Sequence, residues 1–182
     1  TPLWLNANKY GLSSLDKQNG HIRVGIERHI ETDSLREWAI GYGIDIATAS
    51  NYTSNFIIQQ AYGEVSWKKG LLTVGSKEMP MELKNQELSS GSQTLGINAR
   101  PIPQVRLSLP EYWTLPILNN WVSVKGHIAY GKMTDNNWQE DFAASSGNKY
   151  AKDILFHSKA GFIKIGNENK WQHFSLELGL EM

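Results

Sequence analysis

Cysteine is absent from this chain of 182 residues, which excludes disulfides, thiolate nucleophiles and cysteine-ligated metal sites. Net charge is absent too, because 18 lysine and arginine residues balance 18 aspartate and glutamate residues. A neutral chain gives no global electrostatic argument for binding nucleic acid. No apolar run approaches the roughly 18 residues of a transmembrane helix, and the mean hydropathy is -0.42. Taken alone, that average suggests a water-soluble protein.

Recognisable catalytic and cofactor motifs are also missing. The sequence holds no phosphate-binding loop, no nucleophile elbow and no zinc-binding helix. Its five histidines never fall at a spacing typical of metal ligands, and no Ser/His/carboxylate grouping is persuasive. The first residues show no basic segment leading into an apolar stretch, so no signal peptide is expected. The sequence therefore predicts a protein that is not an enzyme and carries no metal or cofactor.

What the chain does contain is alternation of apolar and polar residues along its whole length. In the segment 38–47 the large apolar residues share one face, and small or acidic residues occupy the other: Trp38, Ile40, Tyr42, Ile44 and Ile46 against Ala39, Gly41, Gly43, Asp45 and Ala47. About ten residues of alternation is the length that a tilted strand needs to cross the hydrocarbon of a membrane. Such patterns predict about nine strands, at 3–11, 22–27, 38–47, 56–68, 71–77, 102–109, 122–130, 154–165 and 173–182.

Two local irregularities accompany this pattern. The parity of the segment 154–165 changes at Ile163, which predicts a bulge there. The segment 110–120, with Pro110 and Pro116, is expected to be an irregular connector. No convincing amphipathic helix is found, and the best candidate, 80–88, is short.

A soluble sandwich and a membrane barrel both alternate in this way, because either can bury one face and wet the other. The polar face carries small and ionisable residues in mid-strand, as a wet lumen permits, and aromatic residues gather near strand ends, as in membrane-interface girdles: Trp4, Trp38, Tyr62, Trp67, Trp113, Trp121, Tyr130 and Trp171. The alternative is that these large rings fill a sandwich core. The pattern favours an all-β, antiparallel, up-and-down transmembrane β-barrel, in which a low mean hydropathy is normal because only alternate residues face lipid.

The lengths of the connections point the same way. Longer links are expected near 12–20, 48–55, 78–100 and 133–153, and shorter ones near 29–36, 68–70, 110–120 and 166–170. Outer-membrane barrels have short periplasmic turns and longer outer loops, which gives this rhythm. The parity would place the N-terminus on the periplasmic side.

Several polar and aromatic residues are candidates for contact with a saccharide. Trp138 and Tyr150 lie in the longest predicted loop, where a sugar could stack on a ring, although a membrane-interface anchor is the alternative. Arg100, Gln104 and Arg106 could face the lumen and meet an anionic polymer, or pair with lumen carboxylates. Lys77 completes the candidate set and belongs to a mixed-charge stretch expected to be a solvated outer loop. His127 and His157 are both expected on the polar face, as lumen-lining residues on neighbouring strands.

Several strings of residues resemble the Wzi family of capsule-assembly proteins, in the versions found in Bacteroides-type bacteria. They are Trp4-Leu5-Asn6-Ala7-Asn8-Lys9-Tyr10-Gly11, Phe56-Ile57-Ile58-Gln59-Gln60-Ala61-Tyr62, Gly75-Ser76-Lys77-Glu78, Leu88-Ser89-Ser90-Gly91, Asn98-Ala99-Arg100-Pro101-Ile102-Pro103-Gln104-Val105-Arg106 and Lys125-Gly126-His127-Ile128-Ala129-Tyr130-Gly131. The resemblance covers almost the whole chain. It implies that residues 1–182 form a single domain, the N-terminal portion of a larger barrel of roughly 18 strands.

The function expected from that resemblance is to attach or organise capsular polysaccharide at the surface of the bacterial outer membrane, in a lectin-like, non-catalytic way. The expected partners are capsular or other surface polysaccharide, outer-membrane lipid or lipopolysaccharide, and further barrel strands from the same polypeptide or another chain. The alternative is an outer-membrane channel, or an accessory subunit of an outer-membrane transport or secretion complex. A soluble sandwich or a periplasmic lipocalin-like barrel is a third possibility.

Overall fold

The computed structural model describes residues 9–30, 37–52, 54–80, 97, 99–135, 137–144, 146–167 and 174–182. These residues form eight strands, one α-helix and one short 3-10 helix. The elements are β1 (Gly20–Arg28), β2 (Trp38–Ser50), β3 (Phe56–Trp67), β4 (Gly70–Ser76), β5 (Gln104–Thr114), η1 (Leu118–Asn120), β6 (Val122–Lys132), α2 (Trp138–Ala144), β7 (Leu155–Ile165) and β8 (Leu176–Glu181). The chain is therefore all-β, as its sequence predicted.

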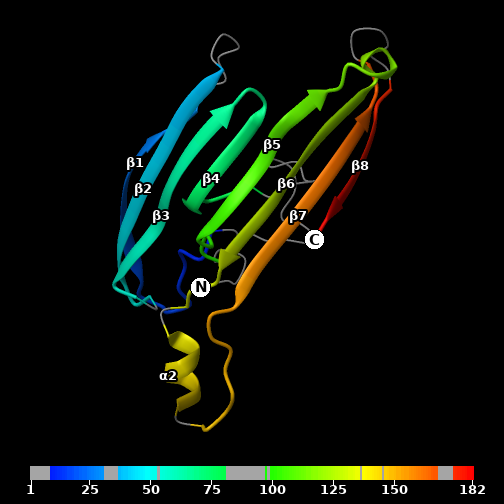
Figure 1. The fold of residues 1–182 in the computed structure, drawn as a ribbon. Helices are drawn as coiled ribbons and strands as arrows, with labels where there is room; N and C mark the ends of the chain where they lie inside the picture. Colours follow the sequence, from blue (N-terminus) through cyan, green and yellow to red (C-terminus); the bar gives the residue numbers. More distant parts are fainter. Residues whose placement is uncertain are drawn as a thin grey trace.

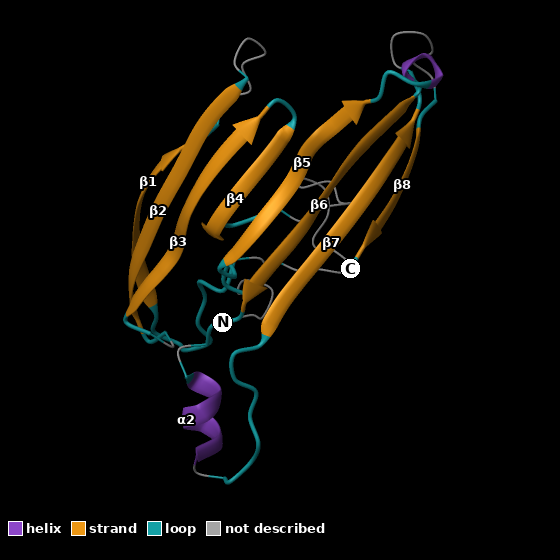
Figure 2. Ribbon diagram, viewed as in Figure 1, coloured by secondary structure: helices purple, strands orange, loops and turns teal. Residues whose placement is uncertain are grey.

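All eight strands belong to one antiparallel sheet, in which each strand pairs with its neighbours in chain order. The curved meander is seen in Figure 1, with β1 at one edge and β8 at the other. Coloured by secondary structure, the same view shows a single layer of strands and one helix standing off its end (Figure 2). The sheet is not closed over the described residues. The strand expected at 3–11 lies mostly outside those residues, and its last part, 9–11, forms a bend and a turn.

The two faces of the sheet differ in chemistry, and in strands such as β2, β3 and β7 they also differ in exposure. On one face, which we call the apolar face, Trp38, Ile44 and Leu178 are 61%, 63% and 56% exposed. The opposite face, the polar face, holds buried Asp45 and Glu64. A sheet in a soluble sandwich buries its apolar side chains instead. These large side chains therefore do not pack together in a dry interior between two sheets.

The polar face is covered in part by the chain itself. Leu12, which precedes β1, packs with Ala47 of β2 and Ile57 of β3 in a small buried cluster. The backbone N–H of Tyr10 donates to the carbonyl of Ile97, 2.7 Å away. Residues from before β1 and from the β4–β5 connection are thus joined to each other. This covering explains why polar side chains of β2 and β3 are shielded from water.

One bulge sets the faces of β3. The pairing with β2 runs from Asp45 with Gln60 to Ile46 with Ile58, so Gln59 is an extra residue. Both Gln59 and Gln60 are buried on the polar face, while Ile58 before them and Ala61 after them are exposed on the apolar face. A bulge absorbs one residue in this way by bending the strand locally.

The bulge that the sequence predicted at Ile163 is wrong. Over the described strands β6 and β7, the pairing runs without a shift from Val122–Ile165 to Lys132–Leu155. Phe162 is buried on the polar face while Ile163 is exposed on the apolar face, so regular alternation holds throughout β7. The error arose because phenylalanine was assumed to mark the apolar face.

The expected connector at 110–120 is also partly wrong. Strand β5 continues to Thr114, with an irregularity in its pairing to β6 between Leu109 and Trp113. Pro110 lies within this irregularity, where its missing N–H is tolerated. The connection to β6 is therefore only 115–121 and contains η1.

The connections divide between two ends of the sheet. At the short-link end are 29–37, 68–69, 115–121 and 166–175, and at the long-link end are 51–55, 77–103 and 133–154. The two longest connections do share one end, as predicted. The strict alternation of long and short does not hold, because 51–55 is shorter than 29–37.

The helix α2 was not predicted, and the candidate helix at 80–88 falls mainly outside the described residues. Asp135 accepts hydrogen bonds from the backbone N–H groups of Asn137 and Gln139, at 3.0 and 3.1 Å, which satisfies donors at the start of the helix. Glu140 and Asp141 add acidic charge to the first turn. No helix in the described part of the chain is long and apolar enough to traverse a lipid bilayer.

Candidate functional site

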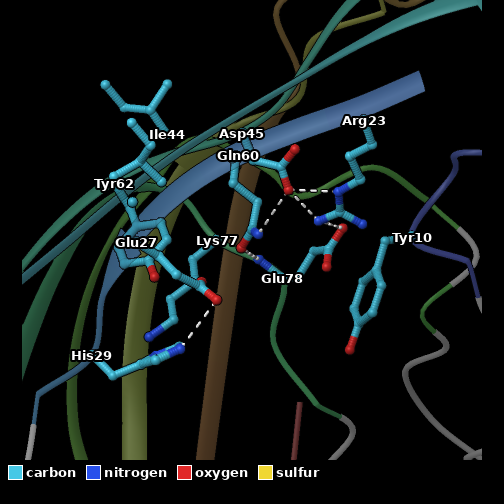
Figure 3. A pocket seen from close by; sticks show the side chains of 13 residues that line it. Tyr10, Arg23, Glu27, His29, Ile44, Asp45, Gln60, Tyr62, Lys77 and Glu78 are labelled. Carbon is cyan, nitrogen blue, oxygen red and sulfur yellow. Dashed lines mark hydrogen bonds and ion pairs between the residues drawn. The ribbon is translucent and has the colours of Figure 1, made fainter.

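An ionic network joins strands β1 and β2 to the start of the β4–β5 connection. Arg23 Nε donates to Asp45 Oδ2 over 2.5 Å, and Arg23 Nη2 lies 3.0 Å from Glu78 Oε1. Gln60 donates to Asp45 over 3.4 Å and accepts from the backbone N–H of Glu78 over 2.8 Å. Figure 3 shows these side chains converging from different strands. The network fixes Glu78 against the polar face.

Gln59, the extra residue of the β3 bulge, extends this network to the N-terminal segment. Its Nε2 donates to Glu78 Oε1 over 2.8 Å and to the carbonyl oxygen of Tyr10 over 2.9 Å. Burial, and then the negative charge of Glu78, raises the pKa of the Tyr10 phenol above its ordinary value. Tyr10 is therefore a neutral hydroxyl group at physiological pH.

Lys77 is held by a second buried group on the same face. Its Nζ donates to Glu64 Oε2 over 2.7 Å and lies 4.7 Å from the centre of the Tyr62 ring. Glu64 also accepts a hydrogen bond from Thr73 Oγ1 over 2.8 Å. Lys77 was expected in a solvated outer loop; it does begin the β4–β5 connection, but its side chain is only 25% exposed, so the expectation of solvation is wrong. Tyr62 was expected near a strand end, whereas it is buried on the polar face within β3.

A cavity of about 490 Å³ lies beside these groups. Its walls include Tyr10, Arg23, Tyr62, Lys77 and Glu78. Cationic groups, anionic groups and phenolic hydroxyl groups thus all face one cavity (Figure 3). Such a lining suits a ligand rich in hydroxyl groups, because each hydroxyl can both donate and accept.

A second cavity, of about 300 Å³, brings together four of the six residues singled out from the sequence. Lys77, Arg100, Gln104 and Arg106 all line it, together with His127. Gln104 and Arg106 face the polar side because they pair with Gly75 and Thr73 of β4. Gln104 Oε1 is buried and has no hydrogen-bond partner among the described residues. The cavity therefore combines three cationic side chains with an amide acceptor and the carboxylate of Glu181.

The other two sequence candidates lie in the connection that contains α2. Trp138 is the first residue of α2, and its side chain lies outside the described part of the structure. Tyr150 donates a hydrogen bond to Glu140, which also accepts from Lys152 Nζ over 2.9 Å. Arg100 lines the second cavity and also a third one, of about 740 Å³, whose wall includes Gln139 of α2. It therefore lies between the candidates on the sheet and those in the connection that contains α2.

The two histidines expected on one face lie on opposite faces. His127 is buried on the polar face, where its Nε2 is 2.9 Å from Ser158 Oγ. His157 is exposed on the apolar face and stacks on Tyr130, with ring centres 4.6 Å apart. Neighbouring residues of a regular strand point to opposite faces. Since Ser158 lies on the polar face beside His127, the preceding residue, His157, lies on the apolar face. Among the described residues, no group of three or more His, Asp or Glu side chains could hold a metal ion.

The comparisons with known proteins return no relative. No protein-family profile matches the chain, and neither a curated protein nor a solved structure is significantly similar to it. The resemblance to the Wzi family therefore stays a prediction from the sequence.

Proposed function

We propose that this chain forms part of a non-catalytic bacterial outer-membrane β-barrel that attaches or organises anionic capsular polysaccharide at the cell surface. The observation that carries this proposal is the reversal of the two sheet faces. Large apolar side chains of β2 and β8 are exposed, while Asp45, Glu64 and His127 are buried on the other face. An exposed apolar surface of this extent requires an apolar neighbour, and lipid suits a continuous sheet face.

Aromatic residues at the short-link end support a membrane location. Trp38 and Trp67 stack there on the apolar face, with ring centres 5.8 Å apart, and Lys68 Nζ lies 5.2 Å from the centre of the Trp67 ring. Trp113 is exposed on the same face and near the same end. Indole rings with nearby cations are typical of the boundary between lipid and water.

The polysaccharide-binding part of the proposal rests on the two cavities of the polar face. Arg100, Arg106 and Lys77 offer charge-assisted hydrogen bonds to carboxylate or phosphate groups on a sugar. The neighbouring cavity, with Tyr10 and Tyr62, offers hydroxyl donors and acceptors. Trp138 and Tyr150 belong to the proposed contact set by their place in the connection that holds α2.

The membrane part is tested by expressing the complete chain in a bacterium with an export signal and separating the membranes. Recovery in the outer-membrane fraction, resistant to alkaline extraction, supports the proposal. Recovery as a monomer in plain buffer contradicts it.

The binding part is tested with the detergent-purified chain and an immobilised capsular polysaccharide. Wild type should be retained, and the Arg100→Gln/Arg106→Gln variant should be retained less, whereas Lys159→Gln on the apolar face should behave as wild type. Conductance in planar bilayers without retention would favour the alternative, a channel or transport subunit.

A further inference from the structure

A basic–aromatic cluster lies on the polar face towards the short-link end, and none of its residues lines the three cavities described above. It consists of Tyr112 of β5, Lys125 of β6, and Phe162 and Lys164 of β7. Lys125 Nζ lies 5.6 Å from the centre of the Tyr112 ring and 4.9 Å from that of Phe162. Lys164 Nζ lies 5.8 Å from the centre of the Tyr112 ring. The ammonium groups of Lys125 and Lys164 thus both lie close to the Tyr112 ring.

The irregularity of β5 is what places Tyr112 there. The pairing jumps from Leu109 with Gly126 to Trp113 with Val124, so β5 has more residues than β6 across this stretch. Trp113 returns to the apolar face, and Tyr112 points to the polar face beside the two lysines. Bulges often re-aim a side chain towards a functional site. The ring is therefore positioned by a local departure from regular pairing.

The electrostatics of the cluster favour an anion. Phe162 is only 2% exposed and closes one side of Lys125, and the Lys164 side chain is 21% exposed. Glu177 Oε1 is 3.9 Å from Lys164 Nζ, which is a loose ion pair on a partly exposed carboxylate. Aromatic faces offset part of the charge of two partly buried ammonium groups, and an added anion would offset more.

We infer that this cluster is a subsite for a carboxylated sugar residue, such as a uronic acid, within the polysaccharide. The sugar ring would stack on Tyr112 while its carboxylate meets Lys125 and Lys164. A neutral sugar could stack on the ring but would add no ion pair with Lys125 or Lys164. The inference rests on the proposed function, and it adds the charge and the chemical class of the ligand.

The test uses the complete chain in detergent and two matched probes, a galacturonic acid trimer and a neutral galactose trimer. Titration calorimetry should show tighter binding of the acidic trimer, with an affinity that falls as salt is added. The Lys125→Gln/Lys164→Gln variant should lose about tenfold or more in affinity for the acidic trimer, because charge-assisted bonds are removed. Its affinity for the neutral trimer should not change.

Lys159→Gln is the matched control, since Lys159 lies on β7 with Lys164 but on the opposite face. It should bind both trimers as wild type does. If the double variant fails to fold, as judged by circular dichroism, the half-buried Lys164→Gln change alone serves the same comparison. An unchanged acidic-trimer affinity in a folded variant, or equal wild-type affinity for the two trimers, overturns this inference alone. Absence of binding to the trimers and to the whole polysaccharide overturns the proposed function as well.

Discussion

Ile44 and Asp45 are neighbours in β2, and the apolar one of the two is the exposed one. Ile44 is 63% exposed, whereas Asp45 is 8% exposed and bonded to Arg23. In a water-soluble sheet the free energy of burial would drive the opposite arrangement. The relation repeats along β3 and β7, so it is not confined to one site.

A charge placed at the centre of the apolar face should be costly in lipid. We expect Ile44→Arg to lower the free energy of unfolding by about 2–4 kcal/mol, because arginine at mid-depth in a bilayer is poorly solvated. Ser50→Arg, on the same face of β2 but at its end, should cost only about 0–1 kcal/mol. Urea unfolding in lipid vesicles, followed by tryptophan fluorescence, measures both. Equal costs would argue against a lipid-facing sheet.

The pair of Arg23 and Asp45 should be energetically coupled. Asp45→Asn should destabilise the protein by about 1–2 kcal/mol, a value reduced by the partial exposure of Arg23 to solvent. Arg23→Gln should cost a similar amount, and the double variant should cost less than the sum. Denaturant titrations of the four proteins give the coupling. Strict additivity would mean that the network contributes nothing beyond its separate side chains.

Gly43 is required because the Tyr62 ring occupies the space of a side chain. A Cβ at position 43 would lie 2.5 Å from Tyr62 Cε1, so Gly43→Ala must displace the ring and its contact with Lys77. We expect a loss of about 1–3 kcal/mol in the free energy of unfolding. Gly63→Ala is the control, since no described atom lies within 4 Å of a Cβ there, and it should be close to neutral. A neutral Gly43→Ala would contradict this packing.

The connection around α2 should loosen in acid. Hydrogen bonds from Lys152 and Tyr150 lower the pKa of Glu140 below its ordinary value, and a bond from Lys132 does the same for Asp153. A depressed carboxylate pKa stabilises the folded form above the unfolded pKa, and that stability is lost as pH falls through the folded pKa. The protection factors of the backbone amides of residues 139–144, which are corrected for the pH dependence of intrinsic exchange, should therefore fall as the pH is lowered through the pKa of these carboxylates.

The matched variants for this pH dependence are available in the same connection. Glu140→Gln should remove part of the dependence and Glu140→Gln/Asp153→Asn most of it. A dependence that survives in the double variant would assign the effect to other groups.

The strands and their faces could be predicted from the sequence because both follow from a local period of two. The strands around Ile44 and Leu178 could be assigned from their own alternation, without knowing which strands lie beside them. The period misled where residue type and face disagree, as with Phe162, which is aromatic yet lies on the polar face. It also gave no warning of the bulge at Gln59, because two adjacent glutamines look like a simple break in the pattern.

The site could be predicted only in part for a related reason. The placement of Arg106 and Gln104 follows from their strand, but their meeting with Lys77 and Arg100 depends on how a long connection returns to the sheet. Nothing local reveals that Glu78 reaches Arg23 across the sheet. The acidic first turn of α2 and the preceding Asp135 were a usable signal for the helix that the period did not supply.

The extra residue in β3, Gln59, contacts the segments on the polar face but takes no part in the pairing with β2. Because Gln59 stands outside the ladder, removing it would leave every other β3 residue on its present face and in its present pairing. What would disappear is its tie to Tyr10 and Glu78. The sheet and the segments that fill its polar side can therefore change independently, so a single-codon deletion could alter what occupies the interior while the wall stays intact.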